Sequence, residues 1–181
     1  GLVVFPRPAS DCAVTQTPDV PIGNLDATQV TALKGFLGTV SPKGKTPLTG
    51  AAILSYAHLY EQPKAGTLKG NLFVVLLTDG FETCALGELP KLLNSPCDPN
   101  DPTSKPCVQT ANSVNIRTFV IGVPGSEDAR ALLSQVAWEG GTAKSTSCTH
   151  NPSPGNVGDC HFDMTTSANF AADLQKALQD I

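Results

Sequence analysis

The sequence lacks long hydrophobic runs and clusters of positive charge. Its longest uninterrupted apolar run is the six residues Leu72–Leu77, whereas a membrane-spanning helix needs about 20. Only 15% of the residues are charged, and the formal net charge is −4. The lysines and arginines form no basic face that could neutralise phosphates. These absences argue against a membrane-spanning segment in this sequence and against nucleic acid as the main partner.

The short motifs of the common enzyme classes are also missing. The sequence contains no Gly-x-Ser-x-Gly, no phosphate-cradling glycine loop and no cysteine in a nucleophilic context. His58 falls within an apolar helical segment and has no obvious catalytic partner. We therefore expect a protein that is not an enzyme.

Six cysteines are present, all in polar connections rich in proline and glycine. The segments Cys97–Cys107 and Cys148–Cys160 each look like a loop closed at its base, which predicts one disulfide for each. Cys12 and Cys84 would then pair by elimination, although spacing alone does not fix the connectivity. Because disulfides persist in oxidising compartments, we expect an extracellular, periplasmic or cell-surface protein.

A zinc site is the alternative for the second of these loops. Cys148, His150, Cys160 and His161 all carry side chains that bind zinc. Their spacing matches no closed structural zinc site, and the segment reads as a loop. A disulfide between the two cysteines is the better interpretation.

The apolar run Leu72–Leu77 reads as a strand buried on both faces, because it shows no alternation with polar residues. Such strands are typical of parallel sheets covered by helices. The run ends at Thr78-Asp79-Gly80, and ligands of open α/β sheets bind beyond the carboxyl ends of the strands. Asp79 is therefore a candidate site residue.

Helical and strand patterns alternate along the rest of the chain. Further strands are expected at Leu2–Phe5, Val20–Ile22, Ile116–Val123 and His161–Phe162, and helices at about 26–40, 46–60, 88–94, 126–140 and 167–181. This order predicts one α/β domain over residues 1–181. Its expected architecture is a three-layer, Rossmann-like α/β/α sandwich whose mostly parallel sheet has one antiparallel edge strand.

Four short segments follow one another in a familiar order: Thr46-Pro-Leu-Thr-Gly-Ala51, Leu76-Leu-Thr-Asp-Gly80, Phe119-Val-Ile-Gly122 and Ala137-Trp-Glu-Gly-Gly-Thr142. Together they resemble a von Willebrand factor type A domain. Phe5-Pro6 and Cys84 are similar to features of the secreted bacterial branch of that family. The similarity covers essentially the whole chain.

Domains of this family typically carry a metal-ion-dependent adhesion site built from three loops. The first loop has the pattern Asp-x-Ser-x-Ser, Thr46 matches the threonine of the second, and Asp79 matches the aspartate of the third. The resemblance implies Mg²⁺, Ca²⁺ or Mn²⁺ as the ion, since hydroxyl and carboxylate oxygens suit these cations. Gly80 and Glu82 would lie at the rim of the site, but a solvated side chain is the preferred interpretation of Glu82.

The first of the three loops is missing from this sequence. The resemblance implies that the central strand, its Asp-x-Ser-x-Ser loop and the following helix would precede Gly1. The related string Asp163–Ser167 is expected to cap the last helix instead of binding metal. An N-terminal fragment, or another copy through self-assembly, is expected to supply the missing strand, because buried backbone groups need partners.

The resemblance implies a non-enzymatic extracellular module for adhesion or protein binding. The metal would bridge to an acidic group of a partner protein. The alternative is a structural subunit of an extracellular assembly or filament, in which the metal site is vestigial. Sensitivity of binding to EDTA would favour the first function, and regular polymers would favour the second.

Overall fold

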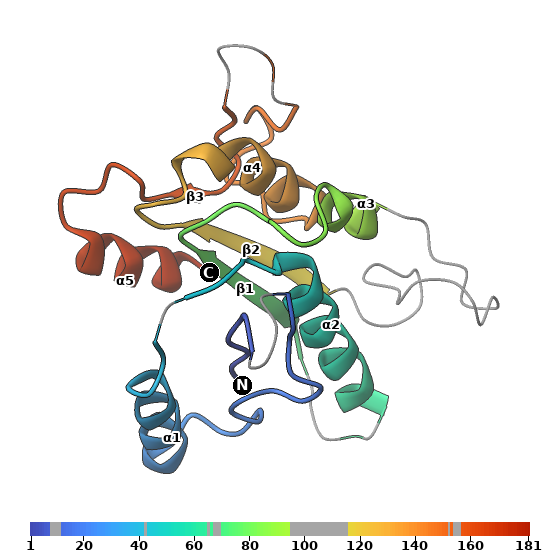
Figure 1. Ribbon diagram of the computed structural model, residues 1–181, viewed down its shortest axis with the longest axis vertical. Helices are drawn as coiled ribbons and strands as arrows, with labels where there is room; N and C mark the ends of the chain where they lie inside the picture. Colours follow the sequence, from blue (N-terminus) through green and yellow to red (C-terminus); the bar gives the residue numbers. More distant parts are fainter. Residues whose placement is uncertain are drawn as a thin grey trace.

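The computed structural model describes residues 1–7, 12–41, 43–64, 66, 70–94, 116–151, 153 and 157–181. The described residues form a mixed α/β structure (Figure 1), which confirms the predicted class. Its elements are, in order, α1 (Ala27–Leu37), α2 (Leu48–Lys64), β1 (Leu72–Thr78), α3 (Glu88–Asn94), β2 (Ile116–Gly122), the 3₁₀ turn η1 (Glu127–Ala129), α4 (Arg130–Glu139), β3 (Phe162–Asp163) and α5 (Phe170–Asp180).

The sheet has three strands in the order β1-β2-β3, and all of them are parallel. β1 and β2 pair along their whole length, from Leu72 opposite Ile116 to Thr78 opposite Gly122. β3 adds only two residues, opposite the end of β2. Because the strands are parallel, their carboxyl ends lie at one end of the sheet (Figure 1). Asp79 directly follows β1 at that end.

Helices α2, α3 and α4 pack over one face of the sheet (Figure 1). Tyr56 of α2 is fully buried there, and its hydroxyl group shares a 2.7 Å hydrogen bond with the Thr118 hydroxyl of β2. Burial raises the pKa of Tyr56 to about 12, so its hydroxyl stays neutral. The core on this face includes Leu48, Ala52, Leu76, Leu89, Ile116, Val120, Leu133 and Val136.

A second, smaller core lies on the opposite face of β2. Val120 belongs to the first core and Ile121 to the second, as expected for neighbouring residues of a strand. Ala177 of α5 is buried with Ile121. Helices therefore pack against both faces of β2, while the full three-layer sandwich with an antiparallel edge strand stays a prediction.

The amino-terminal segment forms less sheet than expected. The predicted strands Leu2–Phe5 and Val20–Ile22 are reduced to one antiparallel bridge between Leu2 and Val20. A side chain supplies a further link, since the Asp19 carboxylate accepts a 2.7 Å hydrogen bond from the Val4 backbone. Pro6 directly follows the first stretch and Pro21 lies inside the second. Because proline has no backbone N–H donor, the pairing does not extend.

Helix α1 is the least buried of the helices. The Asp26 side chain caps it by accepting a 2.9 Å hydrogen bond from the Gln29 backbone, yet none of its residues is buried. The helix ends at Leu37, earlier than the expected Val40. One contact to the amino-terminal segment is the Arg7 guanidinium, which lies 5.1 Å from the centroid of the Phe36 ring.

Two of the three predicted disulfides are confirmed. Cys12 pairs with Cys84, and Cys148 pairs with Cys160. The predicted pair Cys97–Cys107 lies outside the described residues. The Cys12–Cys84 bond ties the amino-terminal segment to the loop that follows β1.

The two disulfides should differ in their contribution to stability. They close loops with sequence separations of 72 and 12 residues. By the chain-entropy model, replacing Cys12 and Cys84 with alanine should cost about 4 kcal/mol, and replacing Cys148 and Cys160 about 3 kcal/mol. Urea unfolding of the two double variants measures both values. A larger loss for the shorter loop would show that loop entropy does not control the difference.

Candidate functional site

Thr46 lies against the loop that follows β1. The Thr46 backbone N–H donates a 2.8 Å hydrogen bond to the Thr83 hydroxyl, and the Thr83 N–H donates a 3.2 Å bond to the Thr46 carbonyl. A Cβ atom added at Gly80 would lie 3.2 Å from the Thr46 hydroxyl oxygen. The Thr46 hydroxyl therefore lies beside the turn that Asp79 begins.

Asp79 occupies the exposed side of this turn. Its side chain is exposed, and its carboxylate makes no hydrogen bond or ion pair within the described part of the chain. The loop after β2 approaches its backbone closely, because a Cβ at Gly125 would lie 2.8 Å from the Asp79 carbonyl oxygen. Gly125 also has φ +108°, which strains any other residue. The loops after β1 and β2 thus meet at Asp79.

Glu82 holds the same loop against the start of α2. Its carboxylate accepts four hydrogen bonds: from the Thr49 N–H at 2.7 Å, the Thr49 hydroxyl at 2.8 Å, the Cys84 N–H at 2.7 Å and the Ala85 N–H at 3.0 Å. Helices begin with unpaired N–H groups, and an anion there is favoured by the helix dipole. Glu82 pairs with one such N–H group at the start of α2, and with two further backbone N–H groups in its own loop.

The expectation that Glu82 is solvated is wrong, because the residue is only 1% exposed. Burial alone would raise the pKa of the Glu82 carboxyl, but the hydrogen bonds from Thr49, Cys84 and Ala85 outweigh burial and lower the pKa. The ionised carboxylate therefore stabilises the fold above the ordinary pKa of glutamate. That contribution is lost as the pH falls through the lowered pKa.

Removing the charge of Glu82 should destabilise the protein. In Glu82→Gln the amide NH₂ would face backbone N–H donors, so at least one strong hydrogen bond is lost and we expect a cost of about 2–3 kcal/mol in urea unfolding at pH 7. The matched control is Glu88→Gln, since Glu88 is exposed and forms a 2.9 Å surface ion pair with Lys91. The control should change stability by less than about 0.5 kcal/mol. Equal effects would contradict the role assigned to Glu82.

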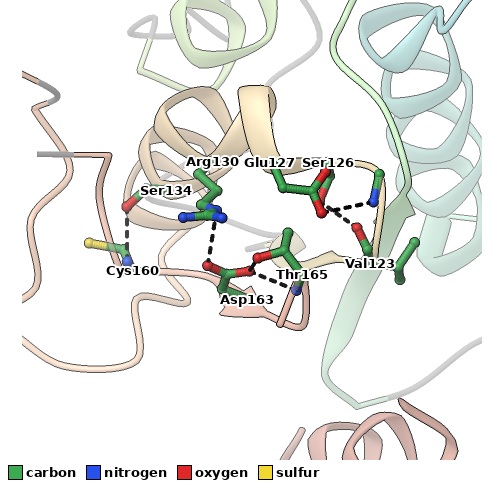
Figure 2. Close-up of polar contacts among 9 residues, drawn as sticks. Val123, Ser126, Glu127, Arg130, Ser134, Cys160, Asp163 and Thr165 are labelled. Atoms are coloured by element: carbon green, nitrogen blue, oxygen red, sulfur yellow. Dashed lines mark hydrogen bonds and ion pairs between the residues drawn. The ribbon is translucent and has the colours of Figure 1, made fainter. Parts of the chain in front are cut away.

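The carboxylate of Asp163, at the end of β3, is paired with Thr165 and Arg130 (Figure 2). Asp163 accepts hydrogen bonds from the Thr165 N–H at 2.9 Å and hydroxyl at 2.7 Å, and it lies 3.4 Å from Nε of Arg130. Burial would raise the pKa of Asp163, but the Thr165 hydrogen bonds and the neighbouring His161 and Arg130 side chains lower it. Asp163 closes its own turn, whereas the side chain that caps α5 is Asn169.

The loop after β2 is also bonded within itself (Figure 2). The Ser126 hydroxyl donates a 2.7 Å hydrogen bond to the Val123 carbonyl, and the Glu127 carboxylate accepts a 3.2 Å bond from the Gly125 N–H. These bonds fix the loop that approaches Asp79. In the turns after β2 and β3, the carboxylates of Glu127 and Asp163 accept hydrogen bonds, whereas those of Asp79 and Asp128 accept none from the described residues.

A separate group of possible metal ligands lies in the loop before β3. In the described part of the chain, Cys148, Asp159 and Cys160 are the one set of three histidine, cysteine or acidic side chains with ligand atoms within 4.8 Å of one another. Both sulfurs belong to the disulfide, so neither is a thiolate. Asp159 also accepts a 2.6 Å hydrogen bond from the Thr149 N–H. The disulfide interpretation of this loop is confirmed, and the oxidised loop offers no sulfur ligands.

His161 is buried beside the end of β2. It is 1% exposed, and neither ring nitrogen has a hydrogen-bond partner among the described residues. A Cβ at Gly122 would lie 3.3 Å from its Nε2 atom. Burial lowers the pKa of His161 to about 4, although the negative charge of Asp163 acts in the opposite direction.

His161 should make the protein less stable in mild acid. Between pH 6.5 and about 4 the unfolded chain binds a proton at this position and the folded chain does not, so the free energy of unfolding should fall by about 3 kcal/mol across this window. His161→Phe should remove this slope, because phenylalanine does not titrate. Urea unfolding at several pH values tests both proteins. Parallel pH profiles for the two would contradict the assignment.

Comparison with family models, with curated proteins and with solved structures finds no match to this chain. Among the described helices, none has both the length and the apolarity needed to cross a bilayer. The site must therefore be interpreted from its own chemistry. The site offers the Thr46 hydroxyl group and the exposed Asp79 carboxylate, at the end of the sheet where the strands finish.

Proposed function

We propose that this chain is a non-enzymatic, extracellular protein-binding module of the von Willebrand factor type A kind. In this proposal the face formed by Thr46 and by the loop after β1 binds a divalent cation. The Thr46 hydroxyl and the Asp79 carboxylate are the ligands that the chain contributes, and Gly80 lies at the rim.

The observation that carries the proposal is the pair of hydrogen bonds between Thr46 and Thr83. Thr46 and Asp79 are 33 positions apart in the sequence, yet these two hydrogen bonds hold their loops together. Sequence spacing alone gives no reason for such an approach. A cation site with one ligand from each loop requires the two loops to lie this close together.

The donor set fits a hard cation. Hydroxyl and carboxylate oxygens suit Mg²⁺, Ca²⁺ or Mn²⁺ and give no preference for a softer metal. In the described part of the chain no histidine, cysteine or acidic cluster of three includes Asp79. Two protein ligands leave most coordination positions to water or to a partner. An acidic group of a partner protein would be a suitable further ligand.

Glu82 would serve as a positioning residue in this arrangement. Its carboxylate fixes the loop after β1 to the first turn of α2, directly after the segment that carries Thr46. Because Glu82 is buried and its oxygens already accept hydrogen bonds, it does not compete for the cation. The two disulfides are consistent with an oxidising, extracellular location.

Cation binding should depend on both proposed ligands. In calorimetric titration with Mn²⁺, the unmodified chain should show a binding isotherm that EDTA reverses. Asp79→Asn should weaken the affinity at least tenfold, and Thr46→Val should weaken it less because a neutral ligand is lost.

The matched control is Asp128→Asn, which removes an exposed carboxylate from the neighbouring loop. That variant should bind Mn²⁺ as the unmodified chain does. Equal loss of affinity in Asp79→Asn and Asp128→Asn would reduce the effect to general surface charge. No binding by the unmodified chain would reject the cation site of this chain.

A further inference from the structure

The base of the loop between Cys148 and Cys160 brings three metal-binding side chains together. The two cysteine sulfurs and a carboxylate oxygen of Asp159 lie within 4.8 Å of one another. Cys148 and Cys160 are 8% and 0% exposed, whereas Asp159 is exposed. In the oxidised chain the two sulfurs are bonded to each other. Reduction of that bond would place two thiols beside a carboxylate.

Hydrogen bonds that do not involve the disulfide also hold the base of this loop. The Thr149 N–H donates a 2.6 Å bond to the Asp159 carboxylate, and the Asp159 N–H donates a 3.2 Å bond to the Thr149 carbonyl. The Lys144 N–H donates a 3.0 Å bond to the Cys160 carbonyl. Breaking the S–S bond therefore leaves the backbone around both cysteines paired.

Ser134 of α4 fixes the same base to the core. Its hydroxyl group accepts a 2.9 Å hydrogen bond from the Cys160 N–H (Figure 2). The same hydroxyl donates a 2.7 Å bond to the Thr149 carbonyl. Gly158 permits this close approach, because a Cβ atom there would lie 2.5 Å from the Ser134 Cβ atom. A site whose ligands are already in position loses less free energy when an ion binds.

The donor set of the reduced loop favours zinc. Thiolate ligands select Zn²⁺ over hard cations such as Mg²⁺ and Ca²⁺, and a carboxylate oxygen also binds zinc. The Thr149 N–H would orient the Asp159 carboxylate from the outer shell of the site. Three protein ligands leave the fourth tetrahedral position to water, as in open zinc sites. An open site does not require the ligand spacing of a closed structural one.

We propose that the reduced chain binds one Zn²⁺ through Cys148, Asp159 and Cys160. The disulfide and the ion are then alternative ways of closing the same loop. This site shares no ligand with the proposed cation face at Thr46 and Asp79, and it does not depend on that proposal.

The change between the two forms is a two-electron step. A dithiol reductant gives two electrons and two protons to the S–S bond, which yields two protein thiols and turns the reductant into a disulfide. Binding of Zn²⁺ then forms two Zn–S bonds and releases both thiol protons to the solvent. The reverse exchange, with a disulfide as the oxidant, forms the S–S bond again and releases the ion.

The test measures alkylation of the chain after reduction with a water-soluble phosphine, which becomes the phosphine oxide. N-ethylmaleimide is added with and without equimolar Zn²⁺, and peptide mass spectrometry gives the alkylation rate of each cysteine. Zn²⁺ should slow alkylation of Cys148 and Cys160 by about tenfold or more and leave Cys12 and Cys84 unchanged, because a metal-bound thiolate is not free to react. Mg²⁺ at the same concentration should protect none of them.

Variants test the third ligand. Asp159→Asn should weaken Zn²⁺ binding by about tenfold or more in competition with a chromophoric zinc indicator. Its amide oxygen can still accept the hydrogen bond from Thr149, so the loop keeps its backbone pairing. The matched control is Asp128→Asn, which removes an exposed carboxylate outside this loop and should bind Zn²⁺ as the unmodified chain does.

Circular dichroism shows whether the reduced chain stays folded before zinc is added. If it stays folded, the alkylation pattern tests the site directly. If it unfolds, Zn²⁺ should restore the fold, because the free energy of metal binding then contributes to folding.

Three results would overturn the proposal. They are equal alkylation of Cys148 and Cys160 with and without Zn²⁺, equal Zn²⁺ affinity of Asp159→Asn and Asp128→Asn, and an unfolded reduced chain that Zn²⁺ does not refold. Absence of Mn²⁺ binding at Asp79 would reject the proposed function and leave this site unaffected.

Discussion

The structure depends most on the buried carboxylate of Glu82. This group joins the first turn of α2 to the loop after β1, and it does so in a place where an unpaired charge would be costly. Four hydrogen bonds compensate for that cost and keep the pKa of Glu82 low despite its burial. With the loop fixed in this way, Thr46 and Asp79 have defined positions relative to each other. The candidate cation site is a consequence of this junction.

The same loop also anchors the amino-terminal segment. Cys84 lies two residues beyond Glu82 and is bonded to Cys12 of that segment. The loop that carries Asp79 is therefore held on two sides, by Glu82 at the start of α2 and by the disulfide at the amino-terminal segment.

Much of the framework follows from local sequence patterns. Burial of a strand on both faces favours a continuous apolar run, which predicts β1. Burial of one helix face favours apolar residues at helical spacing, which predicts α2 and α4. The weaker patterns failed. Leu2–Phe5 and Val20–Ile22 are apolar enough for strands, but Pro6 after the first and Pro21 within the second limit them to one bridge. The disulfides at Cys12–Cys84 and Cys148–Cys160 were predicted from loop composition and from elimination.

The sequence alone determined the residue types of the candidate site: a threonine before a helix and an aspartate after a strand. It could not determine the environment of Glu82 or His161, since burial depends on segments that are distant in the chain. Only the tertiary structure decided that the Glu82 side chain is buried and joins α2 to the loop after β1, instead of being solvated. It alone also decided the strand order β1-β2-β3 of the described sheet, because strand pairing is a contact between segments and has no signature within one strand.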